Sequence, residues 1–178
     1  EMPFDIALLK RIKLLKATQS HINKVTDYLK NNISESIKNN QKFFKEFSEN
    51  CYIVSGGFKE IILPIVEPYG FRKNHVFGNT LIFENNQVKT INMSNPLSKA
   101  NGKITIVKDI NISSSISGET KTSVILGDGY TDYEVFRNGI ASKFICYTEN
   151  ISRDSVLNLS MLSASNFSEV LDILRDLE

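Results

Sequence analysis

The sequence predicts an α/β fold in which a helical N-terminal segment precedes a doubly wound, mainly parallel sheet. Two observations support this prediction. Apolar residues recur at helical spacing through residues 1–46. From Tyr52 onward, short apolar runs that end in turn residues alternate with helical patterns, which is typical of parallel strands linked by helices. We therefore expect residues 1–46 to form a small helical cap and residues 47–178 to form the α/β core.

The N-terminal segment carries one unusual charge on its apolar face. Phe4, Leu8 and Ile12 repeat at helical spacing. Arg11 falls on the same face as Phe4, because seven residues make about two helical turns. Such an arginine either extends its charged end to solvent or binds an anionic group with its planar guanidinium, and the pattern alone leaves both open.

The elements of the core are expected to be short. Apolar runs predict strands at 51–55, near 71–74, and at 80–84, 87–92, 123–127 and 143–147. Helical patterns predict helices at 58–67, 103–109, 131–138 and 167–177. Asn85-Asn86 between two of the strands is typical of a tight hairpin turn. The Ser/Gly-rich stretch 111–122 is expected to be a loop.

The apolar run 123–127 ends in an acidic, glycine-bracketed turn, Gly127-Asp128-Gly129-Tyr130-Thr131-Asp132. The glycines allow a sharp turn and the close approach of a ligand. Asp128 follows the carboxyl end of a predicted strand, which is where open α/β sheets bind ligands. A carboxylate there suits Mg²⁺, which usually shares its oxygen ligands with a substrate phosphate. The alternative is an ordinary turn in which Asp132 caps the next helix.

A second predicted strand ends in Ser55-Gly56-Gly57-Phe58. The Ser55 hydroxyl can donate a hydrogen bond to an anion. The amides of Gly56 and Gly57 are expected near a helix N-terminus, where free N–H groups and the helix dipole favour phosphate. The alternative is a plain strand-to-helix turn.

Lys103 stands at the expected start of helix 103–109, where the helix dipole disfavours a cation. Either it is an ordinary solvated lysine, or it bridges a phosphate and a carboxylate. The first reading would leave it without a role at a ligand site.

Taken in order, these residues resemble the haloacid dehalogenase superfamily of phosphatases, and its phosphoserine phosphatases in particular. The matching motifs are SGGF from Ser55, a lysine at a helix start, and GDGYTD from Gly127. Glu1-Met2-Pro3-Phe4, with Arg11 behind it, is similar to the cap segment that faces the substrate in that family. The resemblance runs from Glu1 to about Arg153. Under a slightly shifted alignment, Lys99 or Asn101 takes the place of Lys103.

The resemblance implies the Mg²⁺-dependent hydrolysis of O-phospho-L-serine to L-serine and phosphate, a step of serine biosynthesis, through an aspartyl-phosphate. Asp128 would be a metal ligand. Ser55, the Gly56 amide and Lys103 would stabilise charge on the transferring oxygens. Asp132 would support the metal's water shell or orient Lys103.

The resemblance further implies that the substrate is bound by Phe4 and Arg11 of the cap together with Ser55, Gly56 and Gly57. Arg11 would bind the substrate carboxylate. The residues from the motif strands are expected to meet at the carboxyl ends of those strands. A HAD phosphatase acting on another small phosphomonoester, and a non-catalytic remnant or domain of a larger protein, are the alternatives.

One motif of the family is absent. The chemistry of the family needs a DxDx[TV] motif at the end of an N-terminal strand. The first aspartate of that motif is the nucleophile and the second is the general acid/base. No Asp-x-Asp occurs in this chain. We therefore expect a fragment that lacks its N-terminal segment, or one piece of a cleaved or split protein, inactive and poorly stable by itself. A fused N-terminal segment is compatible with this expectation. Because the nucleophile strand lies mid-sheet in the family, its loss would leave neighbouring strands without partners.

The composition is that of a globular domain without a strongly charged surface. Hydrophobic residues make up 41% of the 178 residues, charged residues make up 23%, and the net charge is +1. These values argue against disorder and against a nucleic-acid or membrane partner, and no apolar run is long enough to span a bilayer. Cys51 and Cys146 are expected to be buried free thiols, as in a cytoplasmic protein.

Overall fold

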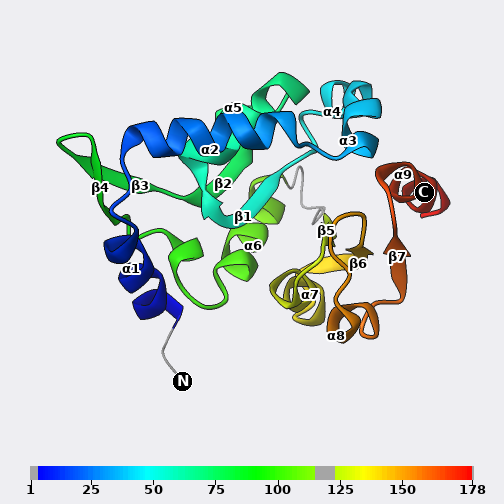
Figure 1. The fold of residues 1–178 in the computed structure, drawn as a ribbon. Coiled ribbons are helices and arrows are strands. Elements are labelled where there is room, and N and C mark those ends of the chain that lie inside the picture. Colours follow the sequence, from blue (N-terminus) through cyan, green and yellow to red (C-terminus); the bar gives the residue numbers. More distant parts are fainter. Residues whose placement is uncertain (1–3, 115–122, 178) are drawn as a thin grey trace. The chain divides into compact units, whose positions relative to one another are not determined.

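The computed structural model describes residues 4–114 and 123–177 (Figure 1). These residues form a mixed α/β fold that contains parallel strands, which confirms the predicted fold class. The chain divides into two compact units, each with its own internal contacts. The first comprises Glu1–Ile33 and Gln41–Gly102, and the second comprises Ser34–Asn40 and Lys103–Glu178.

The first unit combines helices with a parallel strand pair and an antiparallel hairpin. Its α-helices are α1 (Phe4–Leu15), α2 (Gln19–Asn31), α4 (Gln41–Glu46) and α5 (Lys59–Val66). Its 3₁₀ helices are η1 (Glu67–Tyr69), η2 (Lys73–His75) and η3 (Pro96–Ser98). The parallel pair is β1 (Ile53–Phe58) with β2 (Val76–Asn79), and the hairpin is β3 (Leu81–Glu84) with β4 (Gln87–Ile91).

The core of the first unit lies between α1, α2 and the hairpin. Its buried members are Ile12, Ile22, Leu81, Val88 and Ile91. Ile12 is one of the apolar residues whose helical spacing predicted α1. The side chain of Arg11, in contrast, is exposed, and that of Phe4 lies outside the described part of the chain.

The hairpin turn follows from its two asparagines. Asn85 and Asn86 have φ angles of +47° and +66°, the left-handed conformation that both central residues of a type I′ turn require. Asparagine tolerates this conformation better than most residues. The hairpin predicted from the Asn-Asn pair is therefore present.

The second unit is built on a parallel sheet in the order β5-β6-β7 (Figure 1). Its strands are β5 (Ser123–Gly127), β6 (Ala141–Tyr147) and β7 (Leu162–Ala164). Its helices are α3 (Glu35–Asn39), α6 (Gly102–Ser114, whose first residue belongs to the first unit), α7 (Tyr130–Arg137), α8 (Asp154–Leu157) and α9 (Phe167–Asp176). Phe144, Cys146 and Val156 form a buried cluster beside β6.

Several sequence predictions need correction. The strand expected near 71–74 is wrong: Phe71 is buried outside any strand, η2 follows, and β2 begins at Val76. Helix α6 continues to Ser114, so the first part of the expected loop 111–122 is helical, and 115–122 lie outside the described residues. The short elements α8 and β7 were not predicted.

Ser36 fastens the segment Ser34–Asn40 to the rest of the second unit. Its hydroxyl donates to the Glu149 carboxylate at 2.6 Å and accepts the Phe167 N–H at 2.9 Å. The Tyr147 hydroxyl donates to the same carboxylate. Burial and the contact with Glu149 raise the pKa of Tyr147 to about 12. For Glu149, burial opposes ionisation, but the hydrogen bonds from Ser36 and Tyr147 lower its pKa overall.

The helices of residues 4–114 and 123–177 include none with the length and hydropathy of a membrane-spanning segment. Cys51 and Cys146 are both free thiols. Burial raises the pKa of each of them, so both favour the unreactive thiol form.

Candidate functional site

The turn after β5 brings a glycine and an acid into close contact. Gly127 is the last residue of β5, and α7 begins three residues later at Tyr130. A Cβ atom on Gly127 would lie 2.3 Å from the Cγ of Asp132 and 2.6 Å from its Cβ. The turn is therefore built so that Asp132 occupies the space that any other side chain at 127 would need.

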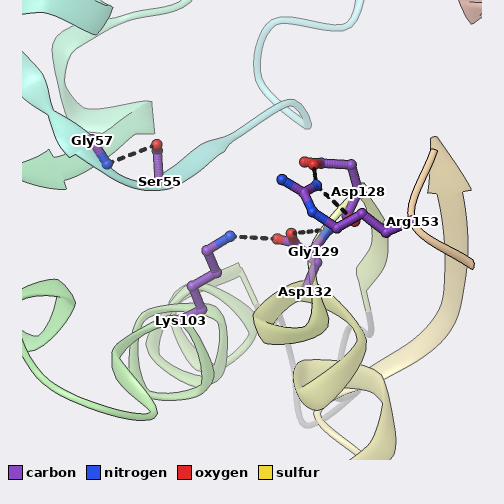
Figure 2. A network of polar contacts seen from close by, with 7 residues as sticks. All are labelled: Ser55, Gly57, Lys103, Asp128, Gly129, Asp132 and Arg153. Atoms are coloured by element: carbon purple, nitrogen blue, oxygen red, sulfur yellow. Dashed lines mark hydrogen bonds and ion pairs between the residues drawn. The ribbon is translucent and has the colours of Figure 1, made fainter. Parts of the chain in front are cut away.

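Asp132 makes two polar contacts, a helix cap and an ion pair with Lys103. One carboxylate oxygen accepts a hydrogen bond from the Gly129 N–H at 3.3 Å, which caps the first turn of α7. The other oxygen forms an ion pair with the Lys103 Nζ at 2.6 Å (Figure 2). The Lys103 side chain is only 20% exposed and the Asp132 side chain only 13% exposed, so this ion pair is largely shielded from water.

Lys103 lies near the start of α6, and the ion pair with Asp132 holds its ammonium group in place. It is the second residue of the helix, where the dipole is unfavourable for a cation. The carboxylate of Asp132 offsets that effect. The alternative positions differ: Lys99 is exposed, and Asn101 lies in a left-handed turn with φ of +61°. Lys103 is thus the residue of the three that is seen in an ion pair with the acidic turn.

Asp128 has a cationic partner that the sequence did not reveal. The Arg153 guanidinium forms an ion pair with the Asp128 carboxylate, and its Nη1 also donates to the Asp128 main-chain carbonyl at 3.2 Å (Figure 2). Both side chains are 45% exposed. Arg153 lies in a loop after β6 and belongs to no recognisable motif, so only its charge offered a signal in the sequence.

Two acids of the turn after β5 were tested against the Mg²⁺ site that the resemblance implied. Carboxylate oxygens of the kind Mg²⁺ prefers are present at Asp128 and Asp132. Each of them, however, is already paired with a cation, Arg153 or Lys103. Among the residues that the structure describes, no group of three or more His, Cys, Asp or Glu side chains is placed to hold a metal ion. These residues alone therefore do not fit a complete Mg²⁺ site.

Ser55, Gly56 and Gly57 lie in the first unit, inside β1. The strand continues to Phe58, which pairs with Asn79 of β2, and α5 begins only at Lys59. The expected end of the strand at Ser55 is therefore wrong: the pairing with β2 is irregular between Val54 and Phe58, across the two glycines, and resumes at Phe58.

The Ser55 hydroxyl is positioned by its own strand. Its Oγ accepts the Gly57 N–H at 3.0 Å (Figure 2). The hydroxyl hydrogen is not used in this contact, so Ser55 can donate it to an anion. The Gly57 amide, which the sequence offered as a phosphate ligand, is already engaged by Ser55.

Asn79 fixes the other side of the same peptide and was missed by the sequence analysis. Its side chain is fully buried, and its Nδ2 donates to the carbonyls of Gly56 at 2.8 Å and Leu97 at 3.2 Å. Its Oδ1 has no hydrogen-bond partner among the described residues. The Gly56–Gly57 peptide is thus held at its carbonyl by Asn79 and at its N–H by Ser55.

The Gly56→Ala variant is expected to bind inorganic phosphate more weakly while unfolding at nearly the same free energy. Gly56 is exposed, and no atom lies within 4 Å of the position that a Cβ would take. The fold therefore does not require glycine at this position, whereas an anion approaching the strand would meet the added methyl group. A ³¹P NMR titration measures the first effect and urea unfolding the second. Unchanged phosphate affinity would contradict a role for Gly56 in anion binding.

The predicted site residues thus fall into two groups. Ser55, Gly56 and Gly57 belong to the first unit, as does α1 with Phe4 and Arg11. Lys103, Asp128 and Asp132 belong to the second unit and lie together around the end of β5. The convergence of both groups on one phosphate stays a prediction.

Comparison with known proteins places the acidic turn and its lysine in context. No family model matches the chain. A chloroplastic phosphoserine phosphatase of Arabidopsis thaliana is 31% identical over 157 residues, which are 87% of this chain and 52% of that protein. A phosphoserine phosphohydrolase-like protein from Francisella tularensis, solved by crystallography, superposes with a TM-score of 0.81 at 27% identity, over 97% of this chain and 77% of its own. The chain resembles the phosphoserine phosphatases of the haloacid dehalogenase superfamily.

The fold agrees with that of a more distant HAD hydrolase. The HAD family hydrolase of Salmonella enterica serovar Typhi superposes with a TM-score of 0.72 at 20% identity, over 92% of this chain and 53% of its own. At that identity the likeness concerns the fold alone. The chain spans about half the length of the Arabidopsis relative. The HAD phosphatase resemblance stated from the motifs is confirmed.

Proposed function

We propose that this chain carries the phosphate-binding part of a Mg²⁺-dependent phosphomonoester hydrolase whose substrate is O-phospho-L-serine. The observation that carries the proposal is the Lys103–Asp132 ion pair, set directly behind the glycine-bracketed turn that presents Asp128. This arrangement fixes a cation and a carboxylate at the carboxyl end of a parallel strand, where α/β folds bind anionic ligands. The names of the relatives supply the substrate class.

Lys103 would neutralise negative charge on the oxygens of the transferring phosphoryl group. A cation already held in place costs little reorganisation when that charge develops, which makes it effective in the transition state. Asp132 holds the ammonium group at 2.6 Å and so fixes its direction. Ser55 would donate its free hydroxyl hydrogen to a second phosphate oxygen. Asp128 is the carboxylate that this chain would contribute to Mg²⁺.

The nucleophile of the proposed reaction would come from outside these residues. The resemblance assigns attack on phosphorus to an aspartate of a DxD motif, and the chain contains no Asp-x-Asp. β5 pairs with β6 on one side and with no other described strand. Its residues Val124 and Leu126 are 38% and 36% exposed, although side chains of parallel strands are usually buried. A strand added at the other edge of β5 would pair with its backbone, and the side chains of that strand would pack beside Val124 and Leu126.

Turnover of phosphoserine tests the proposed reaction, and the Arg11→Ala variant tests whether Arg11 recognises the carboxylate of the substrate. The longest translation product that contains these residues is expected to release phosphate from O-phospho-L-serine. In the Arg11→Ala variant, kcat/KM for phosphoserine should fall about tenfold to hundredfold, because a charge-assisted arginine–carboxylate contact is worth roughly 1.5–3 kcal/mol. Turnover of phosphoethanolamine, which has no carboxylate, should change little. Steady-state kinetics on both substrates measures the difference.

Each outcome of that experiment has a definite meaning. An equal loss for both substrates in Arg11→Ala would show that Arg11 supports the fold or the cap, and would favour a HAD phosphatase acting on another small phosphomonoester. The Lys10→Ala variant is a matched control, because Lys10 is the neighbouring exposed cation on α1. Absence of phosphate release from every member of a phosphomonoester panel would overturn the hydrolase proposal and favour a non-catalytic protein.

A further inference from the structure

Asn79 is a fully buried amide that reaches the Ser55-Gly56-Gly57 stretch of β1 from the neighbouring strand. We propose that Asn79 is a positioning residue for anion binding: it fixes the Gly56–Gly57 peptide, and this peptide orients the Ser55 hydroxyl toward an incoming phosphate oxygen. The inference deepens the proposed function and rests on it, because Ser55 is there given a contact with phosphate. All of these residues lie in the first unit.

The Gly56–Gly57 peptide group is held at both of its polar atoms. Its carbonyl, on Gly56, accepts a hydrogen bond from Asn79 Nδ2 at 2.8 Å. Its N–H, on Gly57, donates to Ser55 Oγ at 3.0 Å (Figure 2). Because a peptide group is planar, a side chain that fixes the direction of the carbonyl also fixes the direction of the N–H. Asn79 therefore determines how the Gly57 N–H meets the Ser55 oxygen.

The N–H that is bound at Ser55 Oγ decides how the hydroxyl is used. A hydroxyl has one donor hydrogen, which rotates to suit its partners, and two acceptor positions. With the Gly57 N–H bound to the oxygen, the hydrogen is directed away from that N–H and stays available to an acceptor. Gly56 is exposed and leaves open space, since no atom lies within 4 Å of the position that its Cβ would take. The Ser55 hydroxyl is thus prepared to donate to an anionic oxygen, which is the stronger kind of hydrogen bond.

The backbone pairing around this peptide is shaped for the Asn79 contact. The register of β1 against β2 shifts between Val54 and Phe58. Such irregular pairing is frequent beside functional sites, where it changes the direction of a side chain. Gly78 permits a close approach of the two strands, because a Cβ on it would lie 3.1 Å from the Gly57 carbonyl oxygen. The side chain that follows Gly78 on β2 is therefore close enough to β1 to bond to its backbone.

The amide of Asn79 is itself fixed by η3. Its Nδ2 also donates to the Leu97 carbonyl at 3.2 Å, and Leu97 is only 4% exposed. Both amide hydrogens are thereby used, whereas Oδ1 has no hydrogen-bond partner among the described residues. A buried acceptor without a partner is unfavourable, so a position that only had to be filled would favour an apolar side chain. The two carbonyls that the amide holds are therefore the physical reason for an asparagine at this position.

Titration of the 178-residue chain with inorganic phosphate, followed by ³¹P NMR, tests the inference through a double-mutant cycle. Asn79→Ala is expected to bind phosphate about threefold to tenfold more weakly than the wild type, because the Ser55 hydroxyl loses its fixed direction. In the Ser55→Ala background the same substitution should have no further effect, since no hydroxyl is left to orient. Hydrogen exchange of the Gly57 amide, also measured by NMR, should become faster in Asn79→Ala because this N–H is no longer held in place.

Asn95→Ala is the matched control. Asn95 Nδ2 donates to the Gly78 carbonyl at 2.7 Å, so this variant breaks an amide–carbonyl bond in the same unit without touching the Gly56–Gly57 peptide. Its phosphate affinity and its Gly57 amide exchange should stay at the wild-type values. Urea unfolding measures how much stability each variant loses.

A second substitution of Asn79 serves if Asn79→Ala does not fold. Asn79→Thr fills more of the vacated space and suits a strand. Its single hydroxyl hydrogen cannot serve both carbonyls, so phosphate binding should weaken in this variant as well.

The possible failures are distinguishable. A purely structural role for Asn79 would lower the free energy of unfolding while leaving phosphate affinity unchanged, or would weaken phosphate binding equally with and without the Ser55 hydroxyl; either result overturns the inference. Absence of phosphate binding by the wild type, or equal binding by the wild type and Ser55→Ala, overturns it too. The proposed function is judged separately, by release of phosphate from phosphoserine by the longest translation product.

Discussion

The Gly127→Ala variant is expected to lose about 1–3 kcal/mol of unfolding free energy, the usual cost of forcing extra atoms into a packed position. The added Cβ would lie 2.6 Å from the Cβ of Asp132, which is closer than such atoms approach in proteins. Because this neighbour is the root of the Asp132 side chain and not its flexible end, either α7 or the β5 turn has to shift. Urea unfolding measures the loss.

The same displacement should break the functional contact. If Asp132 moves, its 2.6 Å ion pair with Lys103 lengthens, and the lysine loses the partner that fixes its direction. Gly129→Ala is the matched control, because a Cβ there would lie 3.2 Å from the flexible end of the same side chain, Oδ2. Its unfolding free energy should change by less than that of Gly127→Ala. Equal losses in the two variants would mean that glycine at 127 is not required by Asp132.

The sequence predicted those strands and turns whose limits are set by neighbouring residues. The limits of β5 agree with the expected range 123–127, because an apolar branched run ends there in glycine. The hairpin was predicted because Asn85 and Asn86 suit left-handed backbone. In contrast, α8 has four residues and β7 has three, too few to show a periodic pattern. The strand expected near 71–74 failed because burial of Phe71 in a non-strand segment gives the same apolar signal.

The sequence predicted which residue types form the candidate site, but not which of those residues contact one another. The motif spacing identified Lys103, Asp128 and Asp132, and the sequence analysis allowed for a contact between the lysine and Asp132. That contact joins residues 29 positions apart, which local patterns do not determine. Arg153 and Asn79 were missed because neither belongs to a motif: one lies in a loop, and the other is a buried amide in an otherwise apolar strand.

Removal of Lys103 is expected to have the largest combined effect on stability and turnover. Lys103→Met leaves the Asp132 carboxylate, whose side chain is 13% exposed, without its cationic partner. Loss of a charged hydrogen-bond partner typically costs about 1–3 kcal/mol of unfolding free energy. If Lys103 also stabilises the transferring phosphoryl group, kcat should fall roughly 10²- to 10³-fold, as when a preorganised electrostatic group is removed. Lys108→Met, an exposed lysine on the same helix, is the matched control for both measurements.

A second substitution separates the two roles of Lys103. Asp132→Asn removes the unpaired charge but keeps an oxygen that can accept the Gly129 N–H, so the double variant Lys103→Met/Asp132→Asn should regain part of the stability that Lys103→Met loses. Its turnover should remain as low as that of the single variant, because no cation then faces the phosphate. Urea unfolding and steady-state kinetics on the longest translation product give the two quantities. Recovery of turnover together with stability would mean that Lys103 acts through the fold alone, and the ion pair would then be only a structural link between α6 and the β5 turn.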